Sequence, residues 1–414
     1  MWGNIMGLIA IILSFEYTLF FIVQSIFQMD EGGAGLRVFS ILFFIPVVVK
    51  FFTSTIQHLK NKDYIVLIFV TAVLSLFYLT RIRYGYVEPG YRGSFLSFGV
   101  RGLPAIFTAV IIAKNKDYFT SMQKWLQPIM LIYSLGVILV VTTSKNTQYI
   151  QFNFSRGGMN YQTLSYCSAF AFNINLFLIL MRGQYENFKI FDNEFWKIVN
   201  MILLPVQIYC LFTGGGRGAM GNIVVVAAFL IYARIGCKLS VRAVGGTVIV
   251  AFIAFFAVSY IANKTGNTGA VRLMEFFGNK ESVLNNERTS MRSVAVGFFW
   301  EKPIFGYGLG SVYYIMGIYS HNLFTDVLME GGLAFFIPVC IIIGIIVIFH
   351  KRMILMDINN VIPYMIFLSS FMMLMFSGYY FNDGGIWFAG TYLIYIITDD
   401  WKRRKILRRY NDEL

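Results

Sequence analysis

The sequence predicts an all-α integral membrane protein, because of its composition and a series of long apolar segments. Of the 414 residues, 57% are hydrophobic and only 13% are charged, which leaves too little polar surface to coat a soluble globule. The apolar segments are about 17–25 residues long, and each can cross a hydrocarbon core of about 30 Å as a helix. They are continuous rather than alternating, which favours helices over a membrane barrel.

About twelve transmembrane helices follow from these segments. The first segment contains Glu16 and has neither a basic start nor a small-residue cleavage site, so we expect a retained span rather than a signal peptide. The segment at 95–113 is less regular, since it contains Arg101 and Pro104. The expected spans are 5–28, 36–58, 64–80, 95–113, 126–143, 161–181, 195–213, 218–234, 243–262, 322–349, 361–378 and 385–400.

The distribution of basic residues predicts which loops face the cytoplasm. The tail WKRRKILRRY (401–410) is strongly basic, which indicates cytoplasmic termini. The basic loops at 60–62, 114–116, 234–242 and 350–352 then fall on the same side. We expect one polytopic domain over residues 1–414, with a long extracytoplasmic loop with short helices at 263–321 and a basic cytoplasmic tail at 401–414. A long loop in a compact bundle usually carries function.

The outer loops contain more arginine than lysine. Membrane topology does not require this choice, whereas bidentate recognition of phosphate or carboxylate does. The net charge of +13 fits a basic cytoplasmic face and gives no reason to expect nucleic-acid binding. Several of these arginines are predicted to bind substrate, in addition to the catalytic candidates described below. They are Arg81, Arg83, Arg92, Arg156 and Arg292.

The stretch TGGGRGAMGN (213–222) places Arg217 among glycines between two apolar segments. Gly215 and Gly216 allow a tight turn and let an anion approach the main-chain N–H groups at the start of the next helix. We therefore expect an anion site here. The alternative is a simple turn whose arginine reaches the membrane surface.

Two further stretches contain candidate catalytic or binding residues. One lies in the long outer loop, and the other lies where this loop ends and the next span begins. In NNERTSMRSVAVGFFW, Arg288 and Arg292 lie four residues apart on one helical face, where a shared anion would offset their repulsion. In YSHNLFTDVLMEGGL, His321 precedes Asp326 and Glu330 at helical spacing, and can serve as a general base or hydrogen-bond donor. A solvated helix face and an interfacial histidine are the respective alternatives.

Other polar positions are less specific. Glu16, Lys50 and Arg101 lie inside or near predicted spans, where ionisable residues are costly and often functional, so an ion or proton path is an alternative. The TDD stretch at 398–400 resembles a pair of metal-binding carboxylates, but its basic neighbours favour a salt-bridged helix end. We expect no metal and no cofactor.

These stretches together resemble the bacterial O-antigen polymerase and ligase superfamily. The matching features occur in order: GGGRGA (214–219) opens a span, ER is followed by W-x-x-P-x-x-G-x-G-x-G (287–310), and HN leads into EGGL (330–333). The resemblance covers about the last half of the chain. It implies a GT-C-like glycosyltransferase in the inner (cytoplasmic) membrane, with its active site on the periplasmic side.

The resemblance also implies roles for individual residues. Arg217 and Arg288 would hold the donor diphosphate, and His321 would lie at the acceptor hydroxyl. Undecaprenyl-diphosphate-linked oligosaccharide would be both donor and acceptor, with membrane lipid and a chain-length regulator protein as further partners. The remaining residues expected to bind substrate are Arg292, Gly215, Gly216, Asn322 and Glu330.

Three functions remain open at this point. A polymerase would lengthen a second lipid-linked glycan, and we favour it. A ligase would transfer the glycan to lipid A core instead. A transporter of lipid-linked glycans or ions would depend on Glu16, Lys50 and Arg101 rather than on the outer arginines.

Overall fold

The computed structural model describes residues 2–27, 45–53, 61–85, 90–143, 161–184, 193–238 and 287–412, with isolated positions between 245 and 271. These residues form helices and connecting turns, and no strand occurs among them. The helices are α1 (Trp2–Phe27), α3 (Asn61–Tyr84), α4 (Gly90–Ser97), the π-helix η2 (Phe98–Gly102), α5 (Leu103–Lys114), α6 (Lys116–Lys124), α7 (Leu126–Thr143), α8 (Tyr161–Leu180), α9 (Glu194–Gly214), α10 (Arg217–Arg234), α14 (Glu287–Glu301), α15 (Ser311–Met316), α16 (Leu323–Met356), α17 (Val361–Phe376) and α18 (Gly384–Asp412). Two 3-10 turns, η4 (Ile358–Asn360) and η5 (Tyr380–Asn382), precede α17 and α18.

Eight helical segments of the described chain are long and apolar enough to cross a membrane. They coincide with the predicted spans at 64–80, 95–113, 126–143, 161–181, 195–213, 218–234, 322–349 and 361–378. A helical membrane protein is therefore confirmed, whereas the total of twelve spans is not. Predicted spans 36–58 and 243–262 lie largely outside the described residues, and α1 and α18 are helices that do not count among the eight.

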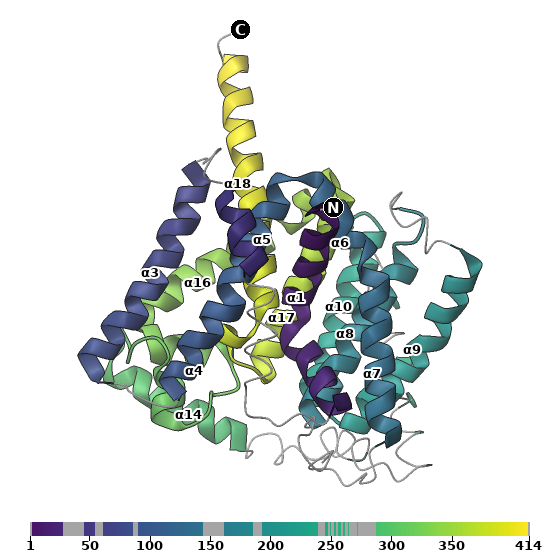
Figure 1. Ribbon diagram of the computed structural model, residues 1–414, viewed down its shortest axis with the longest axis horizontal. Helices are drawn as coiled ribbons and strands as arrows, with labels where there is room; N and C mark the ends of the chain where they lie inside the picture. Colours follow the sequence, from purple (N-terminus) through teal and green to yellow (C-terminus); the bar gives the residue numbers. More distant parts are fainter. Residues whose placement is uncertain are drawn as a thin grey trace.

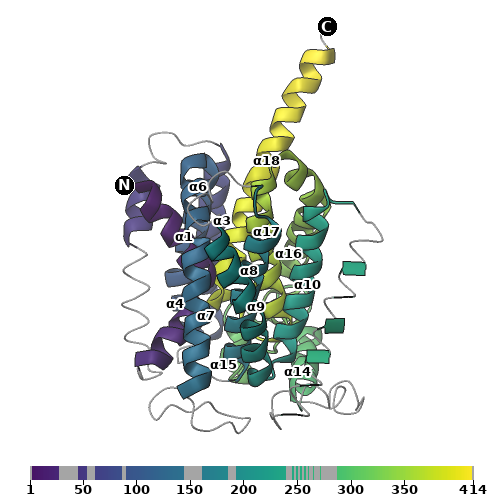
Figure 2. The same cartoon turned by 90° about the vertical axis from the view of Figure 1, so that its right-hand side faces the viewer.

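Both ends of the chain lie at the same end of the helical bundle, and α14 and α15 lie at the opposite end (Figures 1 and 2). We call the latter the α14 end. The last helix, α18, extends beyond the bundle, so the predicted tail continues as helix as far as Asp412. The described part of the long loop consists of α14, α15 and the turns around them.

Buried amide side chains join the middle helices of the bundle. Gln127 of α7 and Asn200 of α9 exchange two hydrogen bonds, at 2.8 and 3.1 Å. Asn173 of α8 donates to Asn222 of α10 at 2.7 Å, and Asn222 donates to the backbone oxygen of Ser369 in α17 at 2.7 Å. Such pairs hold transmembrane helices together where the hydrophobic effect between them is weak. They fix α10 against α8 and α17, whose ends form the site described below.

Helix α16 is interrupted at Gly332, which has φ 56° and ψ −158°. A neighbouring segment replaces the hydrogen bonds that the break leaves open. Tyr307 and Gly308 donate backbone N–H groups to the oxygens of Met329 and Glu330 at 2.9 and 2.7 Å. In return, the N–H groups after the break, at 333 and 334, donate to the oxygens of residues 303 and 304 at 2.8 and 3.0 Å. The P-x-x-G-x-G-x-G stretch therefore completes the broken helix, as buried backbone in a membrane protein requires.

Replacing Gly332 with alanine is expected to destabilise the protein by about 1–3 kcal/mol, because only glycine tolerates this backbone conformation. A Cβ there would also lie 2.5 Å from the backbone of Ile304. The measurement is the thermal unfolding of the detergent-solubilised variant. Gly344→Ala in the same helix is the matched control, since no atom lies within 4 Å of the added carbon. Equal melting temperatures for the two variants would contradict this account of the break.

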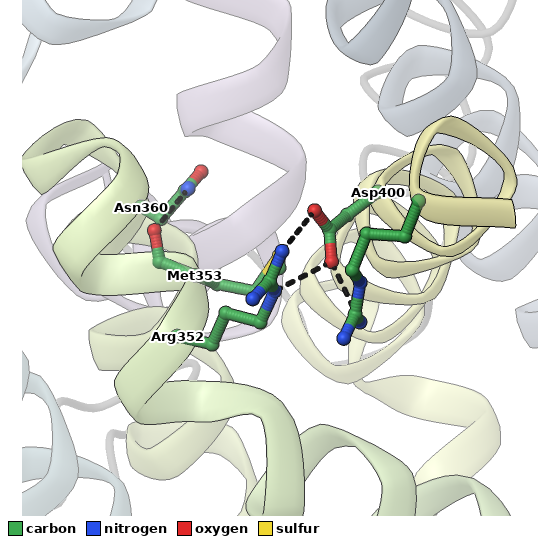
Figure 3. A network of polar contacts seen from close by, with 5 residues as sticks. Arg352, Met353, Asn360 and Asp400 are labelled. Atoms are coloured by element: carbon green, nitrogen blue, oxygen red, sulfur yellow. Dashed lines mark hydrogen bonds and ion pairs between the residues drawn. The ribbon is translucent and has the colours of Figure 1, made fainter. Parts of the chain in front are cut away.

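The C-terminal end of α16 is joined to α18 by ion pairs (Figure 3). Arg352 donates to both carboxylate oxygens of Asp400, at 2.7 and 2.9 Å, and Arg404 lies 2.8 Å from the same carboxylate. Asn360 donates to the backbone oxygen of Met353 at 2.9 Å in the turn between α16 and α17. The salt bridge predicted for the TDD stretch is confirmed, but Asp400 lies within α18 rather than at a helix end, because α18 continues to Asp412.

Candidate functional site

The glycine turn between α9 and α10 is held by α8. Gly215 ends α9 with a left-handed φ of 69°, as expected for a helix C-cap. The N–H of Gly216 donates to the Ser165 hydroxyl at 2.9 Å, and that hydroxyl donates to the backbone oxygen of Leu211 at 3.2 Å. One serine thus links the end of α9 to the start of α10.

Two of the glycines are required by close packing. A Cβ on Gly216 would lie 2.6 Å from Cβ of Ser165, and one on Gly218 would collide with the Tyr166 hydroxyl and with Phe376. The turn therefore approaches both α8 and the end of α17 more closely than any residue with a side chain allows. This packing brings the N-terminus of α10, the positive end of its dipole, beside the C-terminus of α17.

A shallow pocket lies at this junction, and the space between its lining atoms is about 250 Å³ when the open solvent at its mouth is included. Arg217, at the first position of α10, and Arg288, in the first turn of α14, both line it. These arginines come from sequence-distant segments, and the sequence predicted both. The full lining is Gln162, Tyr166, Gly215, Gly216, Arg217, Gly218, Arg288 and Ser377.

Two arginines of α14 donate hydrogen bonds to the C-terminal end of α17. Nη1 of Arg288 donates to the backbone oxygen of Phe376 at 3.0 Å, and Nη2 of Arg292 donates to that of Met375 at 3.2 Å. The last carbonyl groups of a helix lack intrahelical partners and carry its negative dipole end, so they offset two neighbouring cations. Arg292 also donates to the backbone oxygen of His321 at 3.0 Å. Arg292 is thus occupied with backbone groups, while Arg288 also faces the pocket.

His321 is not among the residues that line the pocket. Its side chain is buried, and its ring centre is 4.4 Å from that of Tyr319. Its φ of 61° is unusual for a residue with a side chain, and such strain is common at functional positions. Nδ1 is buried without a hydrogen-bond partner. Arg292, which binds the His321 backbone, connects this residue to α14.

The ionisation of His321 is set by its surroundings. Burial, with smaller contributions from the positive charges of Arg288 and Arg292, lowers the pKa of His321 to about 4. The imidazole is therefore neutral at pH 7 and has a lone pair with which to accept a proton. A positively charged imidazole would be disfavoured unless a bound anion offset the two arginines.

The two carboxylates that follow His321 accept hydrogen bonds that hold neighbouring segments together. Asp326 accepts the backbone N–H of Ser320 at 2.8 Å. Glu330 is fully buried and accepts the N–H groups of Gly310 and Val312 at 3.1 and 3.4 Å, at the start of α15. Glu330 also accepts hydrogen bonds from the hydroxyl groups of two tyrosines, at positions 379 and 380. It therefore joins α15, α16 and the start of η5, and it does not line the pocket.

The other residues predicted to bind substrate fall into three groups. Asn322 caps α16, with its side-chain oxygen accepting the N–H groups of residues 324 and 325 at 3.0 and 3.2 Å. Arg81, Arg83 and Arg92 are exposed, at the end of α3 and in α4, and do not line the pocket. Arg156 lies outside the described residues.

The ionisable residues considered for an ion path contact different parts of the bundle. Arg101 is buried in the π-helix, and its Nη1 lies 3.4 Å from the backbone oxygen of Asn382. Lys50 lies over the ring of Tyr118 in α6, with 5.9 Å between its Nζ and the ring centre. The side chain of Glu16 lies outside the described residues.

Sequence analysis did not single out Gln162, Tyr166 or Ser377. The Ser377 hydroxyl, directly after α17, donates a hydrogen bond to the side chain of Gln162 at the start of α8, at 2.6 Å. A usable signal was present, because each of these polar residues stands within a few positions of a predicted span end. Their convergence depends on helix packing, which one sequence does not display.

Comparison with known proteins supports the assignment suggested by these features. Residues 201–340 match the family model described as O-antigen ligase, and this range contains the glycine turn, both pocket arginines and His321. No curated protein matches the sequence significantly. The family match supports a glycosyltransferase-like function of the ligase or polymerase type. It confirms, for this part of the chain, the predicted resemblance to the O-antigen polymerase and ligase superfamily.

Proposed function

We propose that the protein is a surface-polysaccharide polymerase. It would transfer oligosaccharide repeat units from undecaprenyl diphosphate to another lipid-linked glycan on the outer face of the inner membrane. The observation that carries this proposal is the convergence of Arg217 and Arg288 on one pocket at the N-terminus of α10. Two guanidinium groups and a positive helix end suit a diphosphate better than any neutral ligand.

The proposed reaction uses the diphosphate as leaving group. A hydroxyl oxygen of the acceptor sugar attacks the anomeric carbon of the donor, and the bond from that carbon to the diphosphate oxygen breaks. The electron pair of that bond leaves with the diphosphate, where Arg217 and Arg288 stabilise the growing negative charge. In this scheme the hydroxyl proton passes to the neutral imidazole of His321. Charge stabilisation by arginine makes a divalent cation unnecessary in this proposal.

The arrangement of the bundle supports an outer-face location. Arg288 of α14 lines the pocket, and α14 lies at the end of the bundle opposite both chain termini (Figure 1). Lys351 and Arg352 lie in the last turns of α16, and Lys402 and Arg403 lie in α18, all towards the end that carries the termini. The preference of cytoplasmic loops for basic residues would place that end in the cytoplasm, and hence the pocket outside.

The polymerase is tested by acceptor choice. Purified protein is given a synthetic polyprenyl-diphosphate repeat unit, either alone or with lipid A core, and each reaction is run with and without EDTA. We expect a ladder of lengthened lipid-linked glycans without lipid A core. A single transfer that requires lipid A core would instead establish the ligase function, which the description of the matching family favours. Loss of the ladder on adding EDTA would overturn the metal-independent scheme.

A further inference from the structure

A second basic cluster lies at the α14 end, where α3 meets the segment after α14. Nζ of Lys302 lies 4.4 Å from the ring centre of Tyr84 and 3.9 Å from that of Tyr307. The guanidinium of Arg83 lies 5.4 Å from the Tyr84 ring centre. Such cation–π contacts hold long cationic side chains in place without neutralising them. The second basic cluster is Arg81, Arg83, Tyr84, Lys302 and Tyr307.

The charges of this cluster remain available to an anion. Arg81 and Arg83 are exposed at the end of α3, and no ion pair with a described carboxylate is formed by either. Glu301 directly precedes Lys302 in the sequence, and its carboxylate accepts a hydrogen bond from the Tyr307 hydroxyl. Among the described residues, the cluster therefore keeps its positive charges beside one carboxylate that is already hydrogen-bonded.

Large apolar side chains border the second basic cluster. Trp300, Ile304 and Phe305 are 71%, 60% and 72% exposed, and they precede or follow Lys302 within three positions. Ile82, between the two arginines, is 63% exposed. Exposed apolar side chains beside arginine, lysine and tyrosine are typical of a membrane surface, where acyl or prenyl chains meet charged headgroups. This surface suits a lipid with an anionic headgroup.

The cluster has a fixed relation to the pocket. Arg288 lies in the first turn of α14 and Lys302 directly follows its last residue, so the two sites are separated by roughly 20 Å along one helix. A Cβ on Gly308 would collide with Thr80, which shows how closely the segment after α14 packs on α3. Gly308 is also hydrogen-bonded to Glu330 at the break in α16.

We propose that the second basic cluster binds the diphosphate of the acceptor lipid. Trp300, Ile304 and Phe305 would contact its polyprenyl chain. This inference rests on the proposed polymerase function, in which two lipid diphosphates bind in the same leaflet. The donor reacts at the sugar attached to its diphosphate, whereas the acceptor reacts at its far, non-reducing end. The acceptor diphosphate must therefore lie away from the pocket by the length of an oligosaccharide, and the cluster meets that requirement.

Binding stoichiometry tests the proposal without requiring catalysis. Native mass spectrometry would count undecaprenyl diphosphate molecules bound to protein in nanodiscs of zwitterionic lipid. We expect two molecules on the wild type, one on Arg83→Ala/Lys302→Ala, and one on Arg217→Ala/Arg288→Ala. The matched control is Lys402→Ala/Arg403→Ala, which removes two exposed cations in α18 and should leave two molecules bound. Two molecules on Arg83→Ala/Lys302→Ala would overturn the proposal.

A competing anion distinguishes an acceptor site from a general lipid anchor. Phosphatidylglycerol presents the same phosphate chemistry without a prenyl diphosphate. The acceptor proposal predicts that an equal amount of phosphatidylglycerol leaves both undecaprenyl diphosphate molecules bound. Displacement of the molecule that depends on Arg83 and Lys302 would show a general headgroup site and would overturn the assignment to the acceptor.

Kinetics then connect the cluster to the reaction. The acceptor would carry a non-cleavable phosphonate, so that it cannot act as a donor. For Arg83→Ala/Lys302→Ala we expect the KM for this acceptor to rise about tenfold with unchanged kcat, and no change with an acceptor lacking the lipid diphosphate. An unchanged KM would contradict the acceptor site but not the proposed polymerase function. Absence of transfer by the wild type to either acceptor contradicts the proposed function and leaves the stoichiometry as the test of binding.

Discussion

Replacement of Arg288 with alanine is expected to lower the rate of glycan transfer at least about 100-fold, as loss of one preorganised charge-stabilising donor commonly does. Arg288 lines the pocket and is anchored to the carbonyl of Phe376, so its position is fixed before substrate binds. The measurement is the single-turnover rate with a labelled polyprenyl-diphosphate repeat unit. Most of the loss should appear in kcat, because the charge on the diphosphate develops in the transition state.

Two further variants separate charge from folding. Arg288→Lys keeps the positive charge but loses the planar fork, so we expect a rate between those of wild type and alanine variant. Arg403→Ala removes an exposed arginine of α18 and should retain full activity. An alanine variant at position 288 that folds normally and works within twofold of wild type would remove Arg288 from the mechanism.

Replacement of His321 with alanine is expected to lower kcat by about 10²–10⁴-fold, the usual contribution of a general base. The pH profile gives the more specific test. The base must be neutral, and the pKa of the free protein's imidazole is lowered to about 4 by burial and two arginines. Hence kcat/KM should be constant from about pH 5 upwards through neutrality and fall only as the pH drops through about 4.

The bound donor should move this pKa in a predictable direction. Its diphosphate places negative charge beside Arg288, which offsets part of the positive field at His321 and favours the protonated imidazole. The acidic limb of kcat, which reports the enzyme–substrate complex, should therefore lie at higher pH than that of kcat/KM. A kcat/KM limb near pH 6.5 would show that the titrating group is an unperturbed histidine and would contradict the environment described here.

The sequence predicted the membrane class and most of the spanning segments because both depend on local composition. A helix in hydrocarbon must satisfy its backbone within one continuous apolar segment, so length and hydropathy suffice. The predicted turn at Arg217 rests on equally local information, since consecutive glycines permit the φ of Gly215 and the close approach at Gly218.

Features that depend on packing were not predictable in this way. The break at Gly332 looks like part of a continuous apolar helix in the sequence, and only the insertion of residues 303–308 explains it. The pair Arg288 and Arg292 suggested a shared anion, whereas the structure shows that both also bind carbonyl groups at the end of α17. Contacts between residues so far apart in the chain produce no periodic pattern in the sequence.

Some predicted substrate contacts have a structural explanation for the same reason. Asn322 directly follows His321 in the sequence and Glu330 lies nine residues after it at helical spacing, which suggested a common site. In the folded chain Glu330 accepts the N–H groups at the start of α15, and Asn322 caps α16. A polar residue at a helix end serves capping as readily as binding, and the sequence alone does not separate the two.

The most direct test of the central claim is a cryo-electron-microscopy map of the full chain in nanodiscs with a non-cleavable polyprenyl-diphosphate donor. The account predicts density for the diphosphate in the pocket between Arg217 and Arg288, against the N-terminus of α10. The same density should be absent from Arg217→Ala/Arg288→Ala. A donor diphosphate resolved elsewhere, with the pocket empty in the wild type, would contradict the assignment of this pocket as the donor site.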